Sequence, residues 1–230
     1  MKFIGIDVHK DGLMVACINE NLEILILEEM TREEFYKFAS EEKIQIIAID
    51  APLGPNIGLM DDEIYRKNLD TNINGHYNKK VSEYKLSKMG IRAFSTPKNL
   101  GELVGWKSWM KIGFELNDRL ISMGYHKISS DRMDNVERGI IEVFPHGSFK
   151  VLLGKRPEKK STIEGINQRK SILEEVGFSD IDKYLLNISR KLATDKLDSL
   201  IGAYTALKIF KKQSVFVGDS LEGEIALPLK

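Results

Sequence analysis

The chain has 230 residues, enough for one large domain whose buried core needs neither a metal ion nor a disulfide. Its 34 Lys and Arg residues equal its 34 Asp and Glu residues, so overall charge does not favour a polyanionic partner and any nucleic-acid interface must be local. Cys17 stands alone, which excludes an intrachain disulfide and fits a reducing cytoplasm. With no signal-peptide pattern and no apolar run of roughly 18 to 20 residues, the sequence predicts a soluble cytoplasmic protein rather than a membrane protein.

The N-terminal segment predicts an antiparallel meander followed by a helix. Three strands are expected, at residues 2–8, 13–19 and 22–28. Lys10-Asp-Gly12 and Asn19-Glu-Asn21 supply turn residues between them, and short turns join antiparallel strands. Thr31 and Glu34 have the spacing of a capping box, so a helix is expected from there to about Lys43.

A central strand and a long polar segment follow. Residues 44–52 are almost continuously apolar, which is typical of a parallel strand buried on both faces, and this strand ends near Asp50. Residues 54–138 are polar and charged, with helical stretches near 61–71 and 99–124. We therefore expect a helical insertion or cap in this segment.

Residues 76–111 within this segment are locally basic, with eight Lys or Arg residues against two Glu residues and five aromatic residues among them. Basic side chains neutralise phosphates and aromatic rings stack on unpaired bases, so the segment is a candidate nucleic-acid interface. A solvated helical face with its aromatic residues in the core explains the same pattern. Together with one lysine from the first turn, the candidate contacts are Lys10, Lys79, Lys80, Lys85, Lys88, Arg92, Trp106 and Lys107.

The core pattern then resumes. We expect a strand at 139–147, a helix at 162–176, a long helix from about Thr194 and a C-terminal hairpin within 213–230. The long helix has an apolar stripe at i, i+3, i+4, i+7 and i+10 from Leu197. Its first turn would contain Asp195 and Asp198, where two acids are also explained by attraction to the helix dipole.

Several of these elements carry carboxylates toward their ends, namely Asp7, Asp50, Glu142 and the pair Asp195 and Asp198. Neighbouring parallel strands end at the same edge of a sheet, and an i, i+3 pair lies on one helical face. Converging carboxylates would repel one another unless a divalent cation neutralised them, and oxygen ligands select Mg²⁺ or Mn²⁺. Taken singly, Asp7 is equally explained as an acid that hydrogen-bonds the following turn.

Six segments occur in a specific order along the chain. They are Gly5-Ile-Asp7, Ala48-Ile-Asp-Ala-Pro52, Lys88-Met-Gly-Ile-Arg92, Glu142-Val-Phe-Pro145, Lys160-Ser-Thr-Ile-Glu-Gly165 and Asp195 to Ala206. In this order they resemble the RNase H-like fold in its RuvC-like arrangement, and more specifically a widespread family of unknown function whose members are described as predicted nucleases. The chain departs from that family where Phe144 replaces a His and His146 replaces a Glu.

The resemblance implies a single α/β domain of RNase H-like fold. Its mixed five-stranded sheet would combine an antiparallel meander with parallel strands, with helices on both faces, a helical insertion at 54–138 and a hairpin at 213–230. It implies a nuclease that hydrolyses phosphodiester bonds of DNA or RNA at a two-metal site holding Mg²⁺ or Mn²⁺. Asp7, Asp50, Glu142 and Asp198 would be catalytic metal ligands, and Asp195 would complete the site.

Two other functions remain open. A phosphotransferase or ATPase of the actin, heat-shock chaperone and sugar-kinase type also begins with an Asp-bearing strand, although it needs a second Gly-rich phosphate hairpin that this sequence does not show. A non-catalytic scaffold of the same fold would bind nucleic acid or protein. His9 and Lys10 either orient a phosphate or transfer a proton beside Asp7, or are exposed turn residues. A homodimer would suit a branched DNA substrate.

Overall fold

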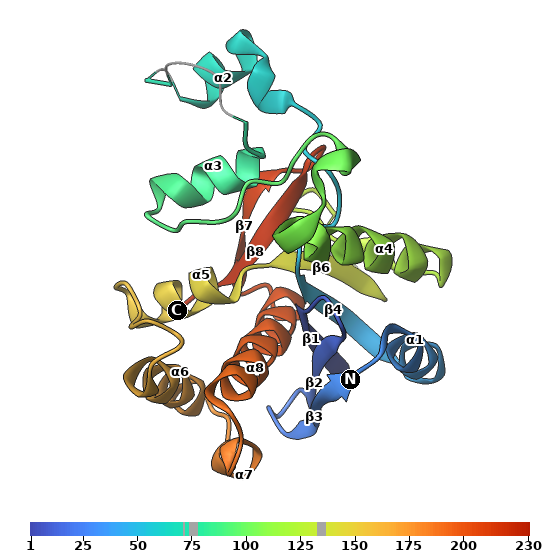
Figure 1. Ribbon diagram of the computed structural model, residues 1–230, viewed down its shortest axis with the longest axis vertical. Coiled ribbons are helices and arrows are strands. Elements are labelled where there is room, and N and C mark those ends of the chain that lie inside the picture. Colours follow the sequence, from blue (N-terminus) through green and yellow to red (C-terminus); the bar gives the residue numbers. More distant parts are fainter. Residues whose placement is uncertain (71, 74–77, 133–136) are drawn as a thin grey trace.

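A mixed eight-stranded sheet forms the centre of the molecule (Figure 1). The structure is a computed structural model, and it describes residues 1–70, 72–73, 78–132 and 137–230. The strand order is β3-β2-β1-β4-β6-β8-β7, and β5 also pairs with β6. The strands are β1 (Lys2–Val8), β2 (Leu13–Asn19), β3 (Ile24–Met30), β4 (Ile44–Asp50), β5 (His126–Lys127), β6 (Gly139–Val143), β7 (Ser214–Asp219) and β8 (Gly223–Pro228). The expected five strands were too few, because β8 pairs with β6 and joins the C-terminal hairpin to the main sheet, and the short β5 pairs with β6 as well.

The expected pairing of the first strands is confirmed. β1, β2 and β3 form an antiparallel meander, whereas β4 is parallel to both β1 and β6. The bounds of β1 and β2 agree with the prediction, but β3 begins two residues late at Ile24. The cause is the turn before it, where Leu22 adopts a left-handed conformation with φ of 64°.

Helices cover both faces of the sheet, as expected (Figure 1). They are α1 (Arg32–Glu41), α2 (Glu63–Leu69), α3 (Val81–Lys88), α4 (Ser108–Ser122), α5 (Pro145–Leu153), α6 (Ile163–Glu175), α7 (Asp182–Leu185) and α8 (Arg190–Phe210). One core lies between the sheet and α5, α6 and α8, and a second lies between the sheet and α1 and α4. Within the described part of the chain, no helix combines the length and apolar character needed to cross a bilayer.

Several predictions of secondary structure need correction. The expected start of α8 at Thr194 is wrong, because Ser189 caps the helix by accepting from the Leu192 N–H and α8 begins at Arg190. The expected strand at 139–147 is too long, because β6 ends at Val143 and Pro145 begins helix α5, and α3 was not expected at all. The stretch near 99–124 becomes α-helical only at Ser108, after two short 3₁₀ turns, Leu100–Glu102 and Gly105–Lys107.

Helix α8 packs so closely against β1 that the two backbones are in contact at Gly5. A Cβ atom added to Gly5 would lie 2.0 Å from the Ser199 carbonyl oxygen and 2.2 Å from the Ala203 nitrogen. On the helix side Gly202 faces the Gly5 Cα, and a Cβ added there would lie 3.2 Å from it. The absence of a side chain at Gly5 therefore sets how closely the two elements approach.

We expect Gly5→Ala to destabilise the fold by about 3 kcal/mol, because the backbone of α8 would have to move to accommodate the methyl group. Urea denaturation followed by circular dichroism measures this change. Gly12→Ala is the matched control, since its new Cβ would lie 3.4 Å from the Met30 carbonyl oxygen and should change stability by less than about 0.5 kcal/mol. Equal unfolding midpoints for the two variants would contradict the close packing described above.

A buried glutamate holds the start of α3 to the following loop. Glu83 accepts a hydrogen bond from the Lys80 N–H at 3.0 Å and another from the Thr96 N–H at 2.7 Å. Burial raises the pKa of Glu83 to about 7, although these hydrogen bonds favour the ionised carboxylate. The folded protein therefore keeps a proton on Glu83 at pH values where the unfolded chain, with a pKa of about 4.3, has lost it.

This shift predicts that stability falls as the pH rises from about 5 to 7, by up to roughly 3 kcal/mol from Glu83 alone. Above the folded pKa the loss is complete. Glu83→Gln should remove this part of the pH dependence, because Gln stays neutral in both states. Free energies of unfolding measured across this pH range for both proteins test the prediction, and parallel curves would refute it.

Candidate metal centre

Asp7 and Asp50 are neighbours at the carboxyl ends of two parallel strands. Strands β1 and β4 pair them directly in register. Alternate residues of a strand share a face, and Ala48, two residues before Asp50, belongs to the core beneath α8. Gly5, two residues before Asp7, touches α8 itself. Both carboxylates therefore point toward the face that α8 covers.

Helix α8 brings two more carboxylates to the same place. Asp195 and Asp198 are both buried, and Asp198 raises the pKa of Asp7 and of Asp50 by its proximity. Both lie beyond the first turn of α8, where the helix dipole no longer acts effectively, so attraction to the dipole does not explain them. The structure thus assembles four of the five predicted acids from β1, β4 and α8.

The fifth predicted acid, Glu142, lies on the opposite face of the sheet. It is level with Ile49 in the pairing of β4 with β6, and Ile49 belongs to the core under α1 and α4. Its Oε2 accepts a hydrogen bond from the Leu53 N–H at 3.3 Å and lies 3.5 Å from the Lys80 Nζ. Glu142 is near enough to raise the pKa of Asp50, but its contacts are those of a buried ion pair with Lys80.

His9 completes the cluster, although sequence reasoning left it open as a turn residue. Its Nε2 lies 3.4 Å from an oxygen of Asp7 and 3.4 Å from an oxygen of Asp195. This nitrogen is buried and forms no hydrogen bond with any described residue. One ligand atom each from Asp7, His9 and Asp195 lie within 4.8 Å of one another, which is compatible with binding one metal ion. The Asp-x-His spacing was the available signal, because alternate residues of an extended chain share a face.

The cluster carries an excess of negative charge. Burial and the neighbouring carboxylates Asp50, Asp198 and Asp195 raise the pKa of Asp7 well above its usual range. Burial and Asp198 do the same to Asp50, and burial raises the pKa of Asp195. Because each ionised carboxylate disfavours the next, the site has the electrostatic character of a cation-binding centre.

Lys160 is the cation that the structure places among these acids. Its Nζ donates to an Asp198 oxygen at 2.9 Å. Burial alone would lower the pKa of Lys160, but Asp198, Asp7 and Asp50 together raise it above the ordinary value. Lys160 is the first residue of the segment Lys160 to Gly165, which carries part of the family resemblance. Nothing in the sequence indicated that its side chain would contact the acids.

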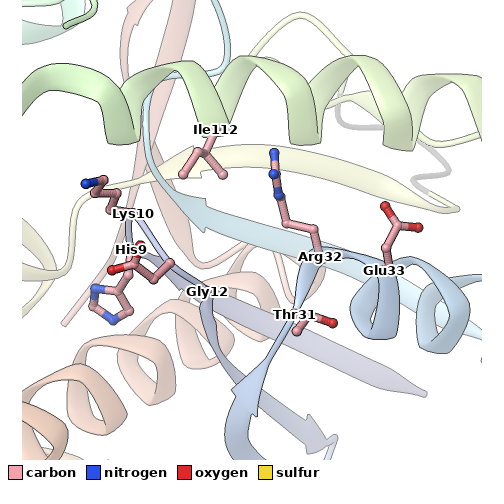
Figure 2. Close-up of a pocket in the computed structure, with 8 residues that line it drawn as sticks. His9, Lys10, Gly12, Thr31, Arg32, Glu33 and Ile112 are labelled. Atoms are coloured by element: carbon pink, nitrogen blue, oxygen red, sulfur yellow. The ribbon is translucent and has the colours of Figure 1, made fainter. Parts of the chain in front are cut away.

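A surface hollow of about 240 Å³ adjoins His9. Figure 2 shows it between the β1–β2 turn, the start of α1 and helix α4, with the His9 ring pointing toward α8 and away from Ile112. Exposed Lys10 also lines this hollow. Of the residues that belong to the acid cluster, His9 alone lines this hollow among the described residues.

The residues predicted to contact nucleic acid differ in exposure and in their partners. Lys80 is only 1% exposed and pairs with Glu142, so it does not present a cation to solvent. The Lys85 Nζ donates to the Gly218 carbonyl oxygen at 2.6 Å, and the Lys88 Nζ lies 2.8 Å from Asp70. Lys10 and Arg92 are exposed, Lys79 and Lys107 are partly buried, and the side chain of Trp106 lies outside the described part of the structure.

Residues 5–222 match the model of a protein family described as "Protein of unknown function (DUF429)". No curated protein and no solved structure matches the chain. The matched region contains all five predicted acids as well as His9 and Lys160. Because the match covers nearly the whole chain, this protein belongs to the DUF429 family of proteins of unknown function.

Proposed function

We propose that the chain is a metal-dependent nuclease that hydrolyses phosphodiester bonds of DNA or RNA. The observation that carries the proposal is the convergence of Asp7, Asp50, Asp195 and Asp198 on one another and on His9. Among the described residues, these acids form close ion pairs with two partners, His9 and Lys160. The order β3-β2-β1-β4-β6, with α8 beneath it, supports an RNase H-like fold.

The donor set fits divalent cations. Asp7, Asp195 and His9 would hold one ion, and Asp50 with Asp198 would hold a second beside it. The buried His9 Nε2 forms no hydrogen bond with a described residue and faces two carboxylates, an arrangement that a cation would complete. Bound cations would polarise a phosphoryl oxygen and lower the pKa of the attacking water.

The protein's own residues set the charge balance of this reaction. The carboxylates hold the metal centre itself negative, so they favour cations there. Lys160 offsets the Asp198 charge from one side. Lys10 lies in the hollow beside His9, where it would meet a nucleic-acid backbone. We place this activity in a reducing cytoplasm, which the single buried thiol of Cys17 supports.

Asp7→Asn should abolish Mn²⁺-dependent cleavage of branched, hybrid and single-stranded nucleic acids, because it removes the carboxylate that faces both groups of ligands. Gel assays across this substrate panel measure the loss, which we expect to exceed about a hundredfold. Asp11→Asn is the matched control, since Asp11 is exposed in the adjacent turn and should retain activity. Equal cleavage by wild type and Asp7→Asn would rule out the proposed site.

The imidazole of His9 predicts a preference for Mn²⁺ over Mg²⁺, because nitrogen ligands suit transition metals better than Mg²⁺. Thermal unfolding with either ion should show the larger stabilisation by Mn²⁺. His9→Ala should reduce this difference, whereas His126→Ala, at an exposed histidine of β5, should leave it unchanged. An unaltered Mn²⁺ preference in His9→Ala would show that His9 is not a ligand.

A further inference from the structure

A basic pocket of about 590 Å³ adjoins the candidate metal centre on the side of Lys160. Its walls come from the start of α5, the loop between α5 and α6, and the middle of α6, which lie beside α8 in Figure 1. The residues that line it are His146, Arg156, Pro157, Glu158, Lys159, Lys160 and Arg169. Four of them are Lys or Arg and one is an acid, in a chain whose net charge is zero.

Arg169 is the unusual member of this pocket because it is buried without a counter-ion. Its side chain is 1% exposed, and no carboxylate lies within ion-pair distance of it in the described part of the chain. The Arg169 Nη1 donates to the carbonyl oxygens of Glu158 and Gly165, at 3.0 and 2.9 Å, but the Nε is buried without a hydrogen-bond partner among the described residues. The Phe149 ring, whose centroid lies 5.4 Å from the Arg169 Cζ, offsets part of the cost of burying this charge, and an anion would offset more of it.

The pocket wall is held in place by close packing. A Cβ added to Gly165 would lie 2.1 Å from the Lys159 carbonyl oxygen, so the loop rests on the first turn of α6. The Thr194 hydroxyl donates to the Lys160 carbonyl oxygen at 3.2 Å, which joins the same loop to α8. The backbone that carries the Lys and Arg side chains of the loop is therefore fixed before a ligand binds. This reduces the conformational entropy lost on binding.

We propose that this pocket binds a phosphate group, and that the phosphate is one that neighbours the scissile phosphate on a nucleic-acid strand. Guanidinium and ammonium groups together are the preferred partners of phosphate oxygens. Lys160 belongs both to the pocket and to the acid cluster, so a single strand would reach the two sites with successive phosphates. The assignment to a strand rests on the proposed nuclease function, whereas phosphate binding itself does not.

The test measures phosphate binding without metal, in EDTA, by titrating the protein with inorganic phosphate and following ³¹P NMR. The double variant Arg156→Gln and Lys159→Gln should weaken binding about tenfold or more, because both side chains are exposed at the pocket and their loss leaves the fold intact. Lys155→Gln is the matched control, since this exposed lysine is adjacent in sequence but does not line the pocket, and it should bind as wild type does.

Absent binding by wild type, or equal weakening by Lys155→Gln, would overturn the proposal. A second arm adds a short single-stranded oligonucleotide in EDTA. Displacement of inorganic phosphate by the oligonucleotide supports a strand as the source, and binding of phosphate without displacement overturns that assignment in favour of free phosphate. Neither arm of the experiment needs cleavage. A protein that binds phosphate but cleaves no nucleic acid would therefore contradict the nuclease proposal and still support phosphate binding in the pocket.

Discussion

The contact between Gly5 of β1 and the backbone of α8 determines how closely the acids of the helix approach those at the strand ends. Asp7 is two residues beyond Gly5, roughly 7 Å along the strand. On α8, Asp198 lies just before the contact at Ser199, roughly 1.5 Å along the axis, and Asp195 lies one turn earlier, roughly 6 Å before Ser199. Both displacements lead toward the end of the strand, where the three carboxylates meet. A side chain at position 5 would push the helix away and separate them.

The same closeness makes the cluster unfavourable for the folded protein without a cation. Burial and mutual repulsion raise the pKa of Asp7, Asp50 and Asp195, so the folded state must either bind protons there or accept the repulsion. The packing of α8 on β1 supplies the stability that holds these groups together, since the core beneath the helix is continuous and apolar. An arrangement that weakens the fold is retained most readily where it serves binding or chemistry, and this favours a functional interpretation of the cluster over a purely structural one.

Local signals predicted much of the fold, but they did not determine which face a side chain occupies. The meander was accessible because β1 and β2 have clear turns between them, and the capping box of Thr31 and Glu34 is present as expected. Glu142 was grouped with the other acids because it also sits in a buried strand, yet its face depends on the register of β6 against β4, which no local pattern shows. Lys160 was missed and the role of His9 was left open for a related reason, since both side chains meet acids of α8 through tertiary contacts.

Although the net charge of the chain is zero, negative and positive side chains are separated around the site. Acids from β1, β4 and α8 form one negative centre, and the loop between α5 and α6 forms a positive wall beside it, with Lys160 common to both. A cation at the acids would make the phosphate pocket more favourable by reducing the negative potential nearby, and by linkage a phosphate in the pocket would strengthen cation binding by the same factor. Under the proposed function, a substrate that supplies both charges, a phosphate backbone with its associated divalent ions, would match this surface better than an uncharged or purely cationic ligand.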